Sequence, residues 1–143
     1  MLAASVMALS FLAGTAGASN ATLKATLDRW STTMAADARA VSLAARQRHP
    51  RAMTAAALRF RRDALLARAA IAARRPSTAK GKRAKLLALT ADTDYARAGA
   101  KWAASGRARV ARRLVLAAAD ARVAAAYARA GNRLLVTAGT LLG

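Results

Sequence analysis

Apolar residues recur every three or four positions along most of the chain after residue 20, which is the spacing of one face of an α-helix. The first stripe predicts a helix from about residue 21 to residue 48, with Asn20 as its N-cap. Pro50 ends this helix, because the residue before a proline is disfavoured in the helical region. Its expected core positions are Leu23, Leu27, Trp30, Met34, Ala38, Val41 and Ala45.

Three further stripes predict three more helices, over residues 51–74, 80–104 and 107–142. Residues 76–78 end the second helix and cap the third, and Ser105-Gly106 is the expected break between the third and the fourth. In the second and third helices the expected core positions are Met53, Ala57, Phe60, Ala64, Ala67, Ile71, Ala84, Ala88, Ala91, Tyr95, Ala98 and Trp102. In the fourth they follow two neighbouring edges, made of Val110, Leu114, Ala117, Ala121 and of Leu116, Val123, Tyr127, Ala130, Leu134, Ala138, Leu141.

Short connections between helices of similar length imply antiparallel neighbours. The expected fold is therefore all-α, an up-down-up-down four-helix bundle over residues 19–143 that follows an N-terminal signal-like segment. Alanine, the strongest helix former, supplies 45 of the 143 residues, whereas the β-branched and aromatic residues of strands are sparse. Since many core positions are alanine, we expect a thin core that depends on close helix approach and a few large side chains.

Residues 1–18 are apolar or small and carry no charged side chain. They end in Ala16-Gly17-Ala18, which fits the small-x-small cleavage pattern of secretory signal peptides, although the usual basic n-region is missing. We expect a signal peptide over these residues, and hence a secreted or extracytoplasmic protein. An uncleaved membrane anchor and a first helix of the bundle are the alternatives; for an anchor, the apolar run is at the short end of what spans a bilayer.

The charge of the chain is strongly one-sided. Lysine and arginine number 25 against 6 aspartates and no glutamate, which gives a formal net charge of +19. Such a charge destabilises a compact state by self-repulsion unless anions compensate it. The composition therefore favours a partner that is polyanionic, and ordinary solvated helix faces are the alternative interpretation.

The cations gather in two places that an up-down bundle puts at opposite ends. One group flanks the first and third connections and comprises Arg48, Arg51, Arg107, Arg109, Arg112 and Arg113. The other surrounds the second connection and comprises Arg74, Arg75, Lys80, Lys82, Arg83 and Lys85. We expect Arg107 and Arg109 at the start of the fourth helix, where cations are unfavourable and free backbone N–H groups bind anions. These residues are the candidate anion-binding positions.

Residues 95–118 resemble a single tetratricopeptide hairpin, a family whose pattern pairs two aromatic residues and a glycine with alanine and a bulky residue in the next helix. The matching positions are Tyr95, Gly99, Trp102, a turn at Gly106, Ala111, Val115 and Ala118. The pattern is not repeated one repeat length upstream. The resemblance implies a hairpin of the third and fourth helices and a close helix contact at Gly99, and it gives no support to a peptide-binding array.

The chain offers little catalytic chemistry. It has no cysteine and one histidine, His49, so a metal site of several converging ligands is not expected. Three of the six aspartates have a helical partner at one-turn spacing, in the pairs Lys24–Asp28, Arg59–Asp63 and Asp94–Arg97. No glycine-rich phosphate loop is present in the sequence. We expect a protein that is not an enzyme and needs no cofactor or small-molecule substrate.

The sequence therefore favours an exported basic bundle that binds anionic envelope components, either lipid head groups or wall polymers, by electrostatic attraction. A helical scaffold that binds a protein partner near Tyr95 and Trp102 is a second interpretation. A nucleic-acid-binding protein is the third, and it requires residues 1–18 not to be a signal.

Overall fold

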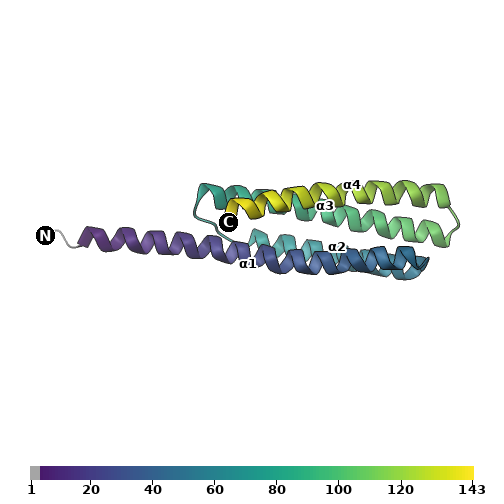
Figure 1. The fold of residues 1–143 in the computed structure, drawn as a ribbon, viewed down its shortest axis with the longest axis horizontal. Helices are drawn as coiled ribbons and strands as arrows, with labels where there is room; N and C mark the ends of the chain where they lie inside the picture. The colour runs from purple at the N-terminus through teal and green to yellow at the C-terminus, as the bar shows by residue number, and fades with distance from the viewer. Residues whose placement is uncertain (1–3) are drawn as a thin grey trace.

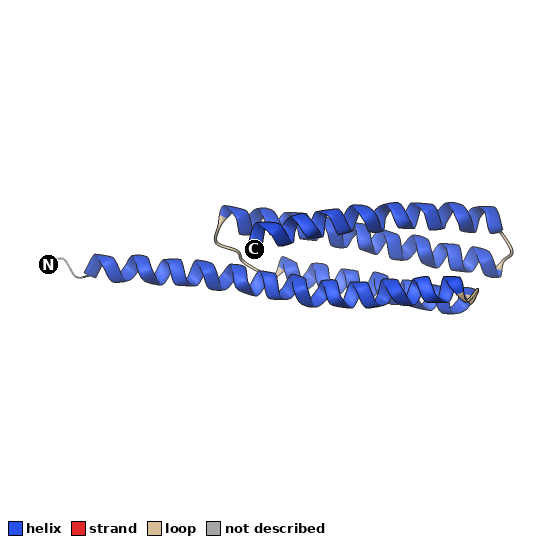
Figure 2. Ribbon diagram, in the orientation of Figure 1, coloured by secondary structure: helices blue, strands red, loops and turns tan. Residues whose placement is uncertain are grey.

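The computed structural model of the chain describes the backbone of residues 4–143 and the side chains of residues 19–143. This part of the chain folds into four α-helices without a strand (Figures 1 and 2). The helices are α1 (Ala4–Arg46), α2 (Pro50–Ala72), α3 (Ala79–Val110) and α4 (Leu114–Leu142). Each runs antiparallel to the preceding helix, so the predicted all-α, up-down-up-down bundle is confirmed.

The α1–α2 and α3–α4 loops lie at one end of the bundle, and the α2–α3 loop and the C-terminus lie at the other (Figure 1). The N-terminal part of α1 extends past the second end. The side chains of the signal-like segment, residues 1–18, lie outside the part that the structure describes, and the signal peptide stays a prediction.

Two helix boundaries predicted from the sequence are wrong. The first helix begins at Ala4 and not near residue 21, so Asn20 is inside it. Instead of capping a helix, the Asn20 amide donates a hydrogen bond of 2.8 Å to the Thr78 hydroxyl and ties α1 to the α2–α3 loop. Thr78 is the predicted cap of the third helix, and its hydroxyl accepts from the Gly81 N–H at 3.0 Å.

The third helix does not break at Ser105-Gly106 but continues to Val110. Gly106 is buried against α2, where a Cβ atom would lie 2.9 Å from the Pro50 carbonyl oxygen. The Ser105 hydroxyl is also buried, and it donates to the Ala117 carbonyl oxygen at 2.7 Å. Both small residues therefore serve helix contacts and not a turn.

The core is a column of three apolar clusters along the bundle axis. Its centre is Phe60, which is 1% exposed and meets Tyr95 and Trp102 edge-to-face, with ring centroids 5.7 and 5.4 Å apart. The other two clusters lie around Leu23 and Ile71 at one end and around Val41 and Met53 at the other. All the core positions predicted for α2 and α3 are buried except Trp102, which is half-buried.

The α2, α3 and α4 backbones approach closely because small residues line the seams. A Cβ atom at Gly99 would lie 2.9 Å from the Ala57 carbonyl oxygen of α2, and one at Gly131 would lie 3.0 Å from the Ala91 carbonyl oxygen of α3. The close contact predicted at Gly99 is therefore present, although its partner is α2. The α4 residues buried against the bundle are Ala117, Asp120, Ala124, Gly131 and Ala138.

The two edges predicted as the core of the fourth helix are confirmed only in part: Ala117 and Ala138 are buried, and Ala121, Tyr127, Ala130, Leu134 and Leu141 are half-buried. Leu114, Leu116 and Val123 are exposed because α4 turns its small-residue face, not its large side chains, toward α3. The turn of the α3–α4 hairpin lies at residues 111–113, so Ala111 and Val115 do not occupy the packing positions that the tetratricopeptide pattern implies.

The seam between α1 and α4 is more open than the other three. Few backbone positions of these helices come close, and long side chains such as Leu135 fill the space. A cavity of about 210 Å³ is left there, and its walls include Met34, Phe60, Tyr95 and Trp102.

Ion pairs add specific contacts between helices. Arg59 of α2 pairs with Asp37 of α1 at 2.6 Å, and Lys101 of α3 pairs with Asp120 of α4 at 2.9 Å. The predicted pairs Lys24–Asp28 and Asp94–Arg97 are present, at 3.0 and 3.4 Å. The predicted pair Arg59–Asp63 is wrong, because Asp63 pairs with Arg62 while Arg59 reaches across to α1.

We predict that Gly99→Ala destabilises the protein by about 1–3 kcal/mol, because the new methyl group meets the rigid backbone of α2. Gly139→Ala is the matched control: a Cβ atom there meets nothing within 4 Å, so this variant gains up to about 1 kcal/mol from helix propensity. Chemical denaturation followed by circular dichroism measures both changes. Equal effects of the two substitutions would contradict the close α2–α3 contact.

Candidate anion-binding site

The loops at one end of the bundle share one backbone geometry. At the end of α1 the His49 N–H donates to the Ala44 carbonyl oxygen at 3.0 Å, and at the end of α3 the Arg113 N–H donates to the Ala108 carbonyl oxygen at 2.8 Å. Shorter-range bonds from the Arg48 and Arg112 N–H groups complete the same Schellman-type ending on both helices.

This ending requires one residue in the left-handed conformation, a place that glycine usually fills. Here the residues are Arg48, with φ 57°, and Arg112, with φ 58°. They are the only non-glycine residues of the described chain with positive φ. A side chain costs about 1–2 kcal/mol in this conformation. Both loops therefore hold an arginine at a position where glycine is the more stable choice.

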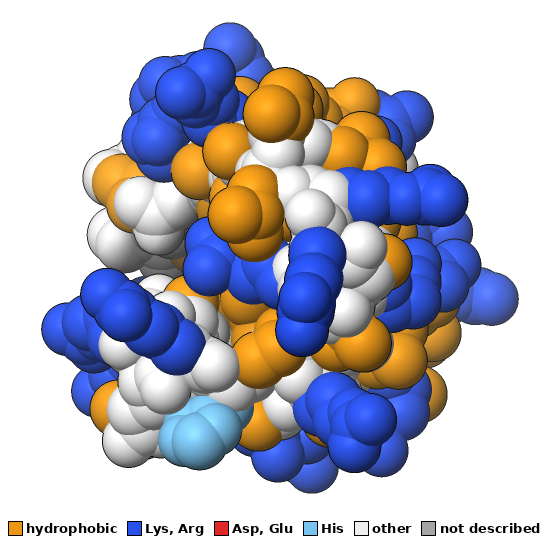
Figure 3. Space-filling model, turned by 90° about the vertical axis from the view of Figure 1, so that its right-hand side faces the viewer, with side chains coloured by type: hydrophobic (Ala, Val, Ile, Leu, Met, Phe, Trp, Pro, Cys, Tyr) orange, Lys and Arg blue, Asp and Glu red, His pale blue; other side chains and the backbone are white. Residues whose placement is uncertain are grey.

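We call this end of the bundle the basic end. It carries seven exposed arginines, which are Arg46, Arg48, Arg51, Arg107, Arg109, Arg112 and Arg113. Figure 3 looks along the bundle at this end and shows lysine and arginine side chains around it, apolar side chains between them, and no acidic side chain. The positive charge of this end is therefore without a local carboxylate to neutralise it.

Arg107 and Arg109 do not start a helix, as the sequence analysis expected, but lie in the last turn of α3. Cations are favourable there because the C-terminal end of a helix carries partial negative charge. The expected contribution of free backbone N–H groups beside these two arginines is therefore wrong. What they contribute to an anion site is side-chain charge.

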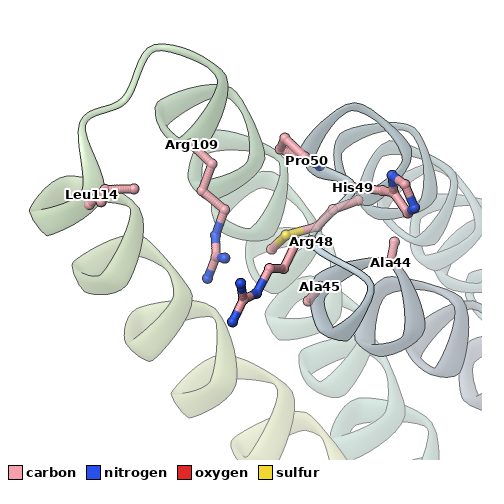
Figure 4. A pocket seen from close by; sticks show the side chains of 8 residues that line it. Ala44, Ala45, Arg48, His49, Pro50, Arg109 and Leu114 are labelled. Atoms are coloured by element: carbon pink, nitrogen blue, oxygen red, sulfur yellow. The ribbon is translucent and has the colours of Figure 1, made fainter.

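The basic end holds a pocket of about 250 Å³ between the two loops. The side chains of Arg48 and Arg109 extend into it from different hairpins, and their guanidinium groups point toward one another (Figure 4). The remaining walls are mainly apolar, from residues that include Pro50, Met53 and Leu114. None of the described residues that line the pocket is acidic.

Two guanidinium groups that face each other repel unless an anion lies between them. Each presents a planar fork of N–H donors that matches the oxygens of a phosphate or carboxylate. The arrangement therefore suits one anionic group bound between Arg48 and Arg109. A second hollow beside it is lined by Arg51, Arg109 and Arg112, which extends the positive surface.

The opposite end carries the other predicted cations. Arg74, Arg75, Lys80, Lys82 and Arg83 are exposed around the α2–α3 loop. Lys85 is different, because its ammonium group donates to the Ala72 and Arg74 carbonyl oxygens, both at 2.6 Å, and so caps the end of α2. The structure thus splits the candidate residues between two ends, and places Lys85 in a structural role.

Neither the convergence of the two pocket arginines nor the apolar walls from Pro50, Met53 and Leu114 follows from the sequence pattern. Arg48 and Arg109 are far apart in sequence and are joined only by the packing of two hairpins. A signal was available in the common ending of the two loops, since an arginine precedes a second basic residue and the start of a helix in both Arg48-His49-Pro50 and Arg112-Arg113-Leu114.

His49 lies exposed at the N-cap of α2, and its carbonyl oxygen accepts from the Met53 N–H at 2.9 Å. Its imidazole points away from the two guanidinium groups (Figure 4). No group of three or more histidine, cysteine or acidic side chains comes together in the described part of the chain. His49 thus lines both hollows of the basic end.

One carboxylate away from the basic end has an unusual environment. Asp92 of α3 is 2% exposed, and its Oδ2 atom has no hydrogen-bond partner. Burial raises the pKa of Asp92 to about 7, although the positive charge of Arg68 partly opposes this. The neighbouring Tyr95 hydroxyl is also affected, because burial and then the Asp92 charge raise the pKa of Tyr95 to about 12. The buried carboxyl of Asp92 therefore bears on the stability of the fold and on its pH dependence.

Comparisons of the chain with models of protein families, with curated proteins and with solved structures found no match. Over the described residues, no helix has a stretch that is both long and apolar enough to span a lipid bilayer.

We predict that Arg48→Gly and Arg112→Gly each stabilise the fold by about 1 kcal/mol, because glycine adopts the left-handed conformation without a steric penalty. Arg46→Gly, in the last turn of α1, is the matched control and destabilises by about 1 kcal/mol. Free energies of unfolding from urea titrations check both. Destabilisation by Arg48→Gly as large as that by Arg46→Gly would show that the loop does not need a left-handed residue.

A second prediction concerns Asp92. The folded protein keeps a proton on Asp92 that the unfolded chain releases above the ordinary pKa of 3.8. The contribution of Asp92 to stability is therefore most favourable below about pH 4 and is lost as the pH rises from about 4 to about 7. Asp92→Asn removes this loss, so the variant gains about 2 kcal/mol relative to the parent between pH 4 and pH 8, after allowance for solvent screening.

Urea unfolding at several pH values measures this gain, with exposed Asp28→Asn as the matched control. An equal change in the pH profiles of both variants would refute the role of the buried carboxylate.

Proposed function

We propose that this protein is an exported, non-enzymatic helical bundle that binds anionic components of the cell envelope through its basic end. The observation that carries the proposal is the convergence of Arg48 and Arg109 on one pocket without an acidic residue. Guanidinium pairs of this kind bind phosphate and carboxylate groups. Lipid head groups and wall polymers both supply such groups.

The distribution of the acidic residues supports this proposal. Five of the six aspartates pair with a cation along the body of the bundle, and Asp92 is buried in it. No aspartate is therefore left to compensate the positive charge of the arginines at the basic end. A surface of one sign attracts a polyanion over a long range, and the attraction weakens as salt screens it.

The signal-like residues 1–18 favour an envelope partner over nucleic acid. If these residues prove not to be a signal, nucleic acid becomes the alternative polyanion. The second alternative, a scaffold that binds a protein near Tyr95 and Trp102, has less support. Tyr95 is 7% exposed, and both aromatic side chains pack against Phe60, which leaves little surface there for a partner.

The test is a double substitution, Arg48→Gly with Arg109→Ala. It removes both guanidinium groups from the pocket, and the glycine is expected to help the fold rather than harm it. Arg122→Ala with Arg129→Ala is the matched control, because it removes the same charge from exposed positions of α4. Each variant is titrated with anionic vesicles and with an anionic wall polymer at 50 and 200 mM salt.

We expect the pocket variant to bind at least about a hundredfold more weakly than the parent, since it loses two charge-assisted contacts of about 1.5–3 kcal/mol each. The control variant should lose about tenfold or less, and all binding should weaken as salt rises. Equal losses in both variants would mean that total charge, and not the pocket, determines binding. Absence of salt-sensitive binding by the parent protein would refute the proposed function.

A further inference from the structure

Large apolar side chains stand exposed at the basic end. Four of them lie within residues 110–116, where Val110 is 49%, Leu114 68%, Val115 88% and Leu116 48% exposed. Val115 has the highest exposure among the large hydrophobic residues described. They alternate with Arg109, Arg112 and Arg113 along the chain, so cations and aliphatic groups share one small surface.

These side chains are exposed because of the way α4 begins. Its first residue is Leu114, and its buried face starts only at Ala117. The first turn of α4 therefore projects beyond the packing layer and presents three consecutive aliphatic residues, Leu-Val-Leu, at the tip of the bundle. Leu114 also forms one wall of the pocket that Arg48 and Arg109 share.

The surroundings of these residues indicate what covers them. An acidic protein partner and a soluble polyanion would both complement the positive charge of this end. A soluble polyanion, however, has no apolar layer that could cover the aliphatic side chains. The boundary of an anionic bilayer has both, with phosphates outside and hydrocarbon a few ångströms deeper. Arginines there keep their charge at the phosphates while aliphatic neighbours enter the hydrocarbon.

We propose that the basic end docks on an anionic phospholipid bilayer, with the aliphatic side chains of residues 114–116 inserted below the head groups and a lipid phosphate held between Arg48 and Arg109. The long axis of the bundle then runs roughly perpendicular to the membrane plane, because the surface that contacts the membrane is the tip of the bundle and not its side (Figures 1 and 3). This inference rests on the proposed function and names the partner. It does not require a helix that spans the bilayer.

The first experiment separates hydrocarbon from charge. Val115→Ser with Leu116→Ser, two exposed residues that line neither hollow of the basic end, is titrated with vesicles that contain anionic phosphatidylglycerol and with soluble polyphosphate. Burial of two aliphatic side chains predicts a loss of vesicle affinity of about tenfold or more. Affinity for polyphosphate should change by less than about twofold, because all arginines remain. Leu65→Ser with Leu66→Ser, an exposed pair on the side of α2, is the matched control and should bind both ligands as the parent does.

The second experiment locates the inserted residue. Because the chain has no cysteine, Val115→Cys and Val136→Cys each give one attachment point for an environment-sensitive fluorophore. Both valines are exposed, but Val136 lies on α4 far from the tip. Vesicles should shift the emission of the label at residue 115 to the blue and leave the label at residue 136 unchanged.

The outcomes are distinct. Selective loss of vesicle binding with a blue shift at residue 115 supports insertion. Unchanged vesicle binding by the Ser variant, or equal shifts of both labels, overturns insertion and leaves the electrostatic function in place. Equal loss of vesicle and polyphosphate binding also overturns it, because the aliphatic residues then serve the pocket. If the parent protein binds neither ligand, the proposed function itself fails.

Discussion

Close approach of α2, α3 and α4 through alanine and glycine is the constraint on which the rest of the structure depends. Large side chains are few, so the helices gain packing by bringing their backbones together, as at Gly99 and Gly131. This approach fixes the register of neighbouring helices within narrow limits. Because the register is fixed, the two hairpin loops finish level with each other, and arginines far apart in sequence meet at one end.

The placement of the acidic residues is the second feature, and it determines how charge is distributed over the surface. Lys101–Asp120 and Arg59–Asp37 join neighbouring helices, so part of the small acidic complement serves to hold the bundle together. No acidic side chain is visible at the tip of the bundle, where the two loops lie, in the view of Figure 3. A surface of positive charge thus results from a segregation of charge along the bundle axis. The arginines at the left-handed loop positions are consistent with this, because they keep charge at the tip where glycine is the more stable residue.

Hydrophobic spacing was sufficient to predict the bundle and the cores of α2 and α3, since both helices have neighbours on two sides and bury one regular stripe. It predicted the core face of α4 only in part, because the closest neighbour of α4 is α3 and the small residues of α4 face that helix. Gly106 was read as a break because a sequence does not tell a glycine in a turn from one pressed against a neighbouring helix. The basic end was predicted, but the convergence of Arg48 with Arg109 depends on how two hairpins pack.

The open seam between α1 and α4 has a consequence for how the protein comes apart. Since α1 is attached chiefly along its contact with α2, it can separate while the other three helices keep their close seams. Opening of α1 should therefore cost less free energy than unfolding of the whole chain. Separation exposes the apolar residues that line the seam, including Met34 and Leu135, to solvent. Local opening of the first helix is therefore expected to expose this apolar surface before the whole chain unfolds.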